Sequence, residues 1–194
     1  MKAILKKLST RLRSISPLIY YLMQYRLAVN KLKDGTRKHD RLFKDFLDTS
    51  SGLKCLQIGV KDDWGAKYGP NWVSVDKFDK SDFIDYDYDI NDLEFEDDAF
   101  DAVACISILE HIPHPATAIK ELHRVLRPGG RIWVQLPFHY PYHNAPYDYW
   151  RVSPNGLRIW MDQFEELACG VSRWCGTSII LASYYYGKKL PATK

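Results

Sequence analysis

From residue 53 onward, short apolar runs alternate with segments of helical periodicity, and this alternation limits the fold more than any other feature of the chain. Between two of these runs, apolar side chains recur at helical spacing over 116–126, and Pro115 suits a first helical turn. Strands that alternate with helices predict parallel βαβ units with right-handed crossovers. We therefore expect a Rossmann-like three-layer αβα sandwich around a mostly parallel sheet. The predicted strands span residues 53–59, 72–76, 83–89, 101–108 and 131–136.

The residues before this pattern are basic and favour helix. Helical spacing of Leu and Ile extends over 1–33, with a break at Ser16 because proline disfavours helix at the residue before it. A Lys-Asp-Gly-Thr sequence at 33–36 predicts a turn. We expect helices at about 18–32 and at 38–48, and we divide the chain into a basic helical extension, 1–48, and a second domain, 49–194.

Residues 138–153 have neither helical nor strand periodicity, and they are dense in aromatic, His and Pro residues. A structureless run of this length inside a domain is usually functional. Ser153 and Pro154 then suit the N-cap and first position of a helix that extends to Phe164. The end of the chain is ambiguous, because residues 177–186 fit either one strand or a helix.

Composition argues against several functional classes. The net charge of +3 is small and the aromatic segment lacks clustered Lys and Arg, so we expect no nucleic-acid partner. The cysteines have no zinc-ligand spacing, so we predict no metal and expect reduced, buried thiols. No apolar run approaches the roughly 20 residues that span a bilayer, and no signal-peptide cleavage site follows an apolar block. We therefore expect a cytoplasmic protein. The four cysteines are Cys55, Cys105, Cys169 and Cys175.

Three predicted strands end in residues that suit a nucleoside. In parallel α/β sheets, ligands bind beyond the carboxyl ends of the strands. Gly59 closes the first strand, where a glycine lets a ligand approach the backbone. Asp76 closes the second and can accept hydrogen bonds from ribose hydroxyls, and Asp89 closes the third and can accept one from the exocyclic amine of adenine. Together they predict an adenosine pocket.

Residues 89–130 contain an acid before a DLxF segment, followed by FDAV, LEHI and RVLRPGG. This block resembles the class I S-adenosylmethionine-dependent methyltransferases of small-molecule type, and the resemblance extends over about 53–136. It implies S-adenosylmethionine as cofactor and a sheet of seven strands with one antiparallel, or of six, since the C-terminal region looks short for both final strands. Matching positions assign the cofactor contacts to Gly59, Asp76, Lys77, Asp89, Ile90 and Ser107.

The loop after the first strand departs from this resemblance. The family's loop usually reads acid-x-Gly-x-Gly-x-Gly, whereas Gln57 replaces the acid here and Val60 and Lys61 stand around the second glycine. A bulky residue is costly where φ is positive. Either the loop takes another path, with Gly65 supplying the bend, or the affinity for the cofactor is reduced.

The aromatic segment should overhang the pocket and bind the acceptor. Methyl transfer requires alignment of the two reactants, and an oxygen acceptor must also lose a proton, most often to His. We predict His143 as this base, with His139 and His111 as alternatives. The sequence PYDYWR, at 146–151, resembles a motif of bacterial methyltransferases that accompany polysaccharide and glycan synthesis. Its aromatic rings could bind the apolar faces of a sugar, or they could pack the segment against the rest of the protein. The predicted substrate contacts are Tyr140, Tyr147, Asp148, Tyr149 and Arg151.

These features favour an S-adenosylmethionine-dependent O-methyltransferase that acts on a hydroxyl of a sugar, a glycan or another small molecule. The altered first loop leaves a non-catalytic methyltransferase-like binding protein as an alternative. An NAD-dependent oxidoreductase is a further alternative, which the missing glycines disfavour. The basic N-terminal helix has three expected roles: contact with an anionic membrane at the inner face, packing on a second subunit in a homodimer, or covering the acceptor pocket.

Overall fold

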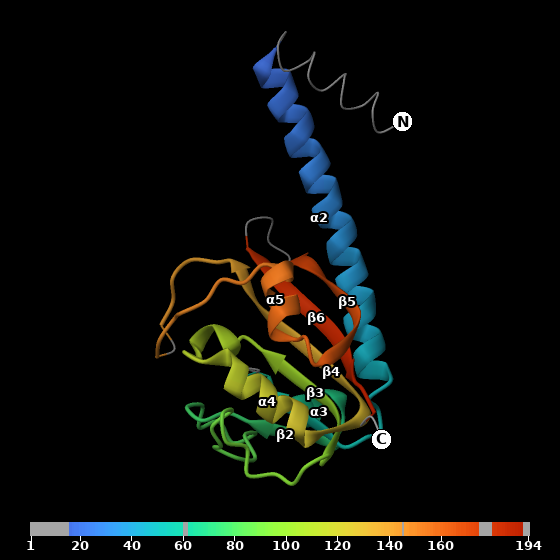
Figure 1. Ribbon diagram of the computed structural model, residues 1–194, viewed down its shortest axis with the longest axis vertical. Helices are drawn as coiled ribbons and strands as arrows, with labels where there is room; N and C mark the ends of the chain where they lie inside the picture. The colour runs from blue at the N-terminus through green and yellow to red at the C-terminus, as the bar shows by residue number, and fades with distance from the viewer. Residues whose placement is uncertain (1–15, 60–61, 145, 175–179, 192–194) are drawn as a thin grey trace.

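A six-stranded mixed sheet forms the centre of the protein (Figure 1). The computed structural model describes residues 16–59, 62–144, 146–174 and 180–191. In these residues the strands are β1 (Cys55–Ile58), β2 (Trp72–Val75), β3 (Phe100–Ile106), β4 (Leu126–His139), β5 (Phe164–Arg173) and β6 (Leu181–Lys189). The helices are α2 (Pro17–Asp48), α3 (Trp64–Tyr68), α4 (Pro115–Val125) and α5 (Pro154–Trp160), with a 3₁₀ turn, η1, at Leu109–His111.

The strand order is β2-β1-β3-β4-β6-β5. β1 pairs in parallel with β2 and β3, and β3 pairs in parallel with β4. β6 is antiparallel to both of its neighbours, β4 and β5. The Rossmann-like arrangement predicted from the βαβ pattern is therefore confirmed, in a mixed sheet with six strands rather than seven.

The two C-terminal strands are both present, so the expectation that the chain is too short for them is wrong. The helical alternative for the end of the chain is also wrong over 181–186, which lies in β6. Tyr184, Tyr185 and Tyr186 are all buried, because β6 lies between two strands and both of its faces are covered. Such a strand has a continuous apolar run instead of an alternating one, and its periodicity cannot distinguish it from a helix.

The strand predicted over 83–89 does not form. Within this fully described stretch, only isolated bridges join Tyr86 to Val75 and Asp89 to Asp92. The backbone N–H of Ser74 on β2 donates to the side chain of Asp85 at 2.8 Å. A carboxylate thus takes the place of one strand carbonyl. The backbone of Asp85 and Tyr86 still bonds to the carbonyl of Ser74 and the N–H of Asp76, so the segment forms a single bridge to β2 and not a paired strand.

Hydrophobic side chains form a separate core on each face of the sheet, and this confirms the predicted three layers. On one face, Leu122 of α4 and Leu157 of α5 are buried against the strands. On the other face, Phe46 of α2 packs against Trp133 of β4, and Trp64 of α3 packs against Trp72 of β2. Figure 1 shows α4 and α5 in front of the sheet, while α2 passes along its β5 side and extends well beyond it.

Helix α2 is continuous, so the turn predicted at 33–36 is wrong. Gly35 lies where the helix crosses β5, and a Cβ at this position would be 2.8 Å from the carbonyl oxygen of Val171. The hydroxyl of Thr36 accepts a hydrogen bond from the backbone N–H of Arg173 at 3.0 Å. The Gly-Thr pair therefore allows the helix to lie close against an edge strand. In sequence, the same pair resembles a turn.

The predicted starts of two helices are confirmed. Pro115 occupies the first turn of α4, and the side chain of Ser153 accepts a hydrogen bond from the N–H of Gly156 at the start of α5. α5 ends at Trp160, before the predicted Phe164, because Phe164 already begins β5 and is buried. Of the segment predicted to be irregular, 138–153, Phe138 and His139 instead belong to β4, and the described part of 140–153 contains neither helix nor strand.

The thiols of Cys55 and Cys105 are free and buried, as expected, and Cys169 is free and half-buried. Burial raises the pKa of Cys55 to about 12. Cys175 and the helix expected over the first 15 residues lie outside the described residues. Among the helices that the structure describes, none has the length and apolar character needed to cross a bilayer.

We predict that Gly35→Ala destabilises the protein by about 1–2 kcal/mol, although alanine is about 1 kcal/mol better than glycine in an exposed helix. The added methyl group must displace the carbonyl of Val171, and urea denaturation measures the cost. Asn30→Ala, at an exposed position of the same helix, is the control and should have no effect or a slight gain. A more stable Gly35→Ala variant would contradict the close approach.

Candidate active site

The carboxyl ends of β1, β2 and β3 lie side by side at one edge of the sheet. The parallel register pairs the last residues of β1 and β2 with each other and aligns both with Cys105 of β3. Gly59 and Asp76, which directly follow β1 and β2, are therefore neighbours, and Ser107 directly follows β3. The structure thus brings three of the predicted cofactor contacts to one edge.

Two of these strand ends have a left-handed backbone, with φ values of 79° at Gly59 and 57° at Ser107. A Cβ at Gly59 would lie 1.9 Å from Cγ1 of Ile108 and 2.6 Å from the carbonyl oxygen of Ile106, so only glycine fits there. The N–H of Ser107 donates to the carbonyl of Gln135 at 2.9 Å, which holds the strained residue in place. Strain of this kind concentrates at ligand sites.

Asp76 offers one carboxylate oxygen to a ligand. Its Oδ1 accepts hydrogen bonds from the backbone N–H groups of Phe78 at 2.8 Å and Asp79 at 2.9 Å. Within the described residues, no hydrogen bond reaches its Oδ2. The side chain therefore holds its own turn with one oxygen, and the other can accept from a hydroxyl group.

Lys77 and Asp89 contact each other, at 2.7 Å. The second oxygen of Asp89 accepts from the backbone and side chain of Asn91. Although partial burial opposes its ionisation, the hydrogen bonds from Lys77 and Asn91 hold the pKa of Asp89 below its ordinary value. An adenine amine would therefore have to compete with Lys77 for Asp89. The side chain of Ile90 belongs to the hydrophobic core.

The first loop does not bend at Gly65, so that proposed path is wrong. Gly65 lies inside α3, whose first turn is capped by the side chain of Asp63. Gln57, which stands where the family has an acid, is buried and donates to the hydroxyl of Ser74. Its Oε1 has no hydrogen-bond partner in the described part of the chain. Val60 and Lys61 lie outside the described residues.

The segment after β4 folds back over η1. The backbone N–H groups of Tyr149 and Trp150 both donate to the carbonyl of Glu110, at 2.8 and 3.3 Å. The indole N–H of Trp150 donates to the carbonyl of Ile112 at 2.9 Å. These contacts explain how an irregular segment lies in a defined position next to the end of β3.

A partly buried ion pair holds this segment in shape. The guanidinium of Arg151 contacts both oxygens of Asp148, at 2.6 and 2.7 Å, and also donates to the carbonyls of Tyr140 and Pro141. The Asp148 side chain is only 2% exposed, and Arg151 lowers its pKa to about 2. Asp148 and Arg151, which we predicted to bind substrate, therefore bind each other and the backbone instead. They hold the other predicted substrate residues in position.

The aromatic rings of the segment differ in exposure. Tyr147 and Tyr149 are 62% and 47% exposed, so their rings are available to an acceptor. Tyr140 is half-buried, and its ring lies 4.9 Å from that of His143. Trp150 packs edge-on against Trp160 at 5.8 Å, which fits the alternative role of holding the segment down.

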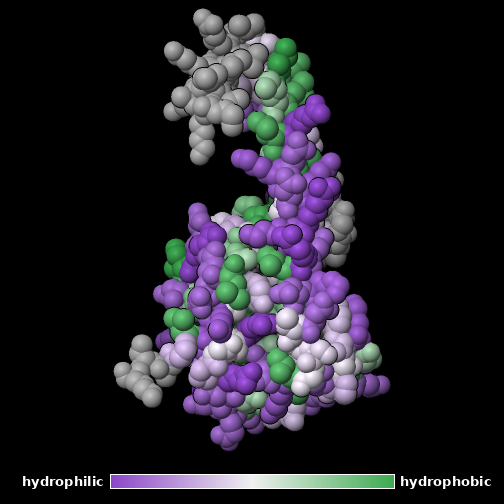
Figure 2. Space-filling view, turned by 90° about the vertical axis from the view of Figure 1, so that its right-hand side faces the viewer, coloured by the Kyte–Doolittle hydropathy of each residue, from purple (hydrophilic) through white to green (hydrophobic). Residues whose placement is uncertain are grey.

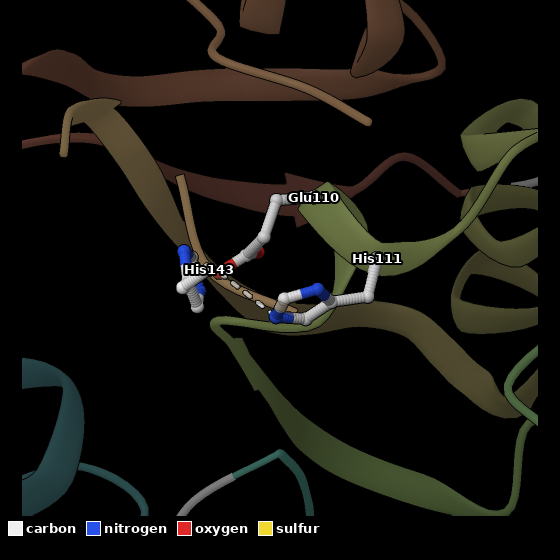
Figure 3. A group of neighbouring side chains, drawn as sticks. All are labelled: Glu110, His111 and His143. Carbon is white, nitrogen blue, oxygen red and sulfur yellow. Dashed lines mark ion pairs between the residues drawn. The ribbon is translucent and has the colours of Figure 1, made fainter. Parts of the chain in front are cut away.

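Glu110, His111 and His143 lie together where the segment crosses η1 (Figure 3). The His111 and His143 rings are 5.0 Å apart, and Nε2 of His111 is 3.8 Å from Oε1 of Glu110. Burial raises the pKa of Glu110 to about 8 and lowers the pKa of His111. Two of the three predicted catalytic histidines thus meet. The third, His139, is exposed at the end of β4 and is not part of this group.

The sequence alone led us to assign no catalytic or binding role to Glu110. The LEHI motif marked it, but nothing in its spacing indicated that His143 would reach it. One signal could have pointed to Glu110. An acid and a histidine stand together shortly after one predicted strand, and further histidines follow the next predicted strand.

Comparisons with known proteins relate this chain to methyltransferases. Residues 67–134 match a family model described as a methyltransferase domain. The ubiquinone biosynthesis O-methyltransferase of Pseudomonas aeruginosa is 46% identical over 35 residues, which are 18% of this chain and 15% of that protein. That of Xylella fastidiosa is 48% identical over 46 residues, which are 23% of this chain and 19% of that protein. The chain therefore spans less than a fifth of these curated relatives.

Solved structures of low sequence identity have the same fold. A chain in the complex of a Haloferax volcanii methyltransferase with its Trm112 activator has a TM-score of 0.59 at 14% identity, covering 88% of this chain and 96% of that one. The N-methyltransferase NodS of Bradyrhizobium japonicum has a TM-score of 0.58 at 14% identity, covering 80% and 96%. The chain therefore carries a methyltransferase-domain segment within the fold of the class I methyltransferases, and this implies S-adenosylmethionine as the cofactor.

Proposed function

We propose that this protein transfers the methyl group of S-adenosylmethionine to a hydroxyl of a sugar, a glycan or another small-molecule acceptor. One observation carries the proposal: the segment that follows β4 contains His143 and folds back over η1, next to the end of β3 and so to the edge formed by β1, β2 and β3. The match to O-methyltransferases of ubiquinone biosynthesis supports an oxygen acceptor, although it covers few residues.

The residues at the strand ends fit the nucleoside part of this cofactor. Asp76 has a carboxylate oxygen that can accept from the ribose, and its other oxygen fixes the turn that orients it. Asp89 can accept from the adenine amine if Lys77 moves away. When bound, S-adenosylmethionine supplies an electrophilic methyl group on a good leaving group. The protein must then orient the acceptor and take its proton.

His143 is the best candidate to take this proton. Its backbone N–H donates to Asp148 at 2.8 Å, and its Nδ1 lies 3.3 Å from both Asp148 and Arg151. The ion pair therefore fixes its position, while the side chain remains 33% exposed and within reach of an acceptor. The exposed rings of Tyr147 and Tyr149 suit the apolar faces of a sugar.

The N-terminal end of α2 supports a peripheral membrane contact. Residues 1–33 contain eight Lys or Arg and no Asp or Glu. Figure 2 shows hydrophobic residues gathered on the part of α2 that extends beyond the sheet. An anionic lipid surface matches both the charge and the exposed apolar side chains. This apolar end consists of Leu18, Ile19, Tyr21, Leu22, Met23, Tyr25 and Leu27.

Asp76→Asn should weaken binding of S-adenosylhomocysteine by about 10- to 100-fold, because an amide N–H₂ cannot accept from a ribose hydroxyl. Asparagine still offers an oxygen to the N–H groups of Phe78 and Asp79, so the turn is kept. Isothermal titration calorimetry measures the affinity, and the exposed Asp87→Asn is the control. Equal affinities for all three proteins would rule out the proposed nucleoside site.

Methyl transfer should fall by about 10²- to 10⁴-fold in His143→Ala, with the affinity for S-adenosylhomocysteine unchanged. The assay offers a panel of nucleotide sugars, free sugars and catechols, and mass spectrometry identifies O-methylated products. His114→Ala, an exposed histidine outside the site, should retain activity. A product methylated on nitrogen, or full activity in His143→Ala, would overturn the assigned chemistry.

Full-length protein should float with vesicles of anionic phosphatidylglycerol and not with pure phosphatidylcholine. Replacing Leu22 and Tyr25 with Ser should reduce this binding by more than about tenfold, since both side chains would lie in the interface. Gln24→Ser is the matched control. If the Leu22 and Tyr25 variant floated as the unmodified protein does, membrane contact would be rejected. It would also be rejected if the substitutions disrupted a dimer but left lipid binding unchanged.

A further inference from the structure

The Glu110, His111 and His143 side chains form a converging group from two separate elements. Glu110 and His111 lie in η1, directly beyond β3, and His143 lies in the segment that follows β4 (Figure 3). One ligand atom from each residue lies within 4.8 Å of the other two. Such a group has the composition of a metal site, but proximity alone does not establish one.

The second observation is the state of Glu110. Its side chain is completely buried, yet neither of its carboxylate oxygens has a hydrogen-bond partner among the described residues. Burying an acid without partners is costly. The nearby Arg151 does not relieve this cost by hydrogen bonding, because its guanidinium is engaged with Asp148. A cation between the three side chains would satisfy Glu110.

The histidines are oriented as metal ligands usually are. Nδ1 of His111 contacts the carbonyl oxygen of Tyr147, which leaves Nε2 as the nitrogen directed toward Glu110. His143 is held by Asp148 through its backbone N–H. Its Nδ1 lies 3.3 Å from the carbonyl of Pro141, from a carboxylate oxygen of Asp148 and from the guanidinium of Arg151. Carbonyl and carboxylate partners of this kind fix the ring orientation of metal-ligating histidines.

We propose that Glu110, His111 and His143 bind a divalent transition-metal ion, for which Zn²⁺ is the best match, in a site with an open coordination position. Two imidazoles and one carboxylate are ligands for such ions, and three protein ligands leave a position for water or substrate. Bonds of about 2.1 Å require ligand atoms about 3.4 Å apart in a tetrahedral site, so the side chains draw together on binding.

The role of the open position rests on the proposed function, whereas metal binding itself does not. An acceptor hydroxyl bound to the cation would lose its proton more readily. His143 would then act as a ligand of the ion that activates the hydroxyl. Loss of His143 would stop methyl transfer in either case, so a direct measurement of the metal is needed.

The test is calorimetric titration of the full-length, EDTA-treated protein with ZnCl₂, without methyl donor or acceptor. We expect one equivalent to bind, and Co²⁺ in its place should give the visible absorption of a protein-bound ion. Glu110→Gln and His143→Ala should each weaken binding by more than about 100-fold, beyond the 10- to 100-fold typical of losing an outer partner. His114→Ala should bind as the unmodified protein does.

Thermal unfolding of the metal-free proteins separates loss of a ligand from loss of the fold. Glu110→Gln should unfold at or above the temperature of the unmodified protein, because the carboxylate it removes has no partner. No binding by the unmodified protein, or equal binding by Glu110→Gln, would overturn the metal site. Methyl transfer that persists in EDTA would remove the catalytic role of the ion and leave the proposed function standing.

Discussion

The ion pair between Asp148 and Arg151 is the interaction on which the site depends. It is partly buried, it joins both carboxylate oxygens to one guanidinium, and that guanidinium also binds the carbonyls of Tyr140 and Pro141. An irregular segment has no ladder of backbone hydrogen bonds to fix its course. This pair supplies that constraint, and it brings His143 to within ring contact of His111. Loss of Arg151 would leave the buried Asp148 carboxylate without its partner, which is costly, so the segment and the cluster are maintained together.

The two sides of the site are built by different means. The cofactor side follows from sheet register: parallel strands end at one edge, and Gly59 and Asp76 are neighbours because β1 and β2 are paired. The acceptor side follows from side-chain and carbonyl contacts in the segment after β4. A rigid edge suits a cofactor shared by many enzymes, and a segment held by a few specific contacts suits an acceptor that differs between them.

Much of the fold could be predicted from sequence, because buried parallel strands and capped helices leave local patterns. The runs that became β1 to β4 were such cases, as was Ser153 at the start of α5. The errors have one physical origin, which is that tertiary contacts override local preference. Gly35 resembles a turn residue in sequence but allows the close approach of α2 to β5, and the Asp85 side chain replaces one backbone partner of Ser74 on β2. In the site, the strand-end residues were predictable from topology. Glu110 was not, because its meeting with His143 depends on a fold-back that sequence spacing does not encode.

The central claim is that the edge formed by β1, β2 and β3 holds the nucleoside of the methyl donor and faces the histidine cluster. A crystal structure of the protein with S-adenosylhomocysteine tests it most directly. We expect the ribose hydroxyls within hydrogen-bond distance of Asp76, the adenine near Asp89 with Lys77 displaced, and the sulfur directed toward His143. A nucleoside bound elsewhere would contradict this claim. So would a structure at saturating ligand in which Ile108 and the Lys77–Asp89 pair still fill the edge.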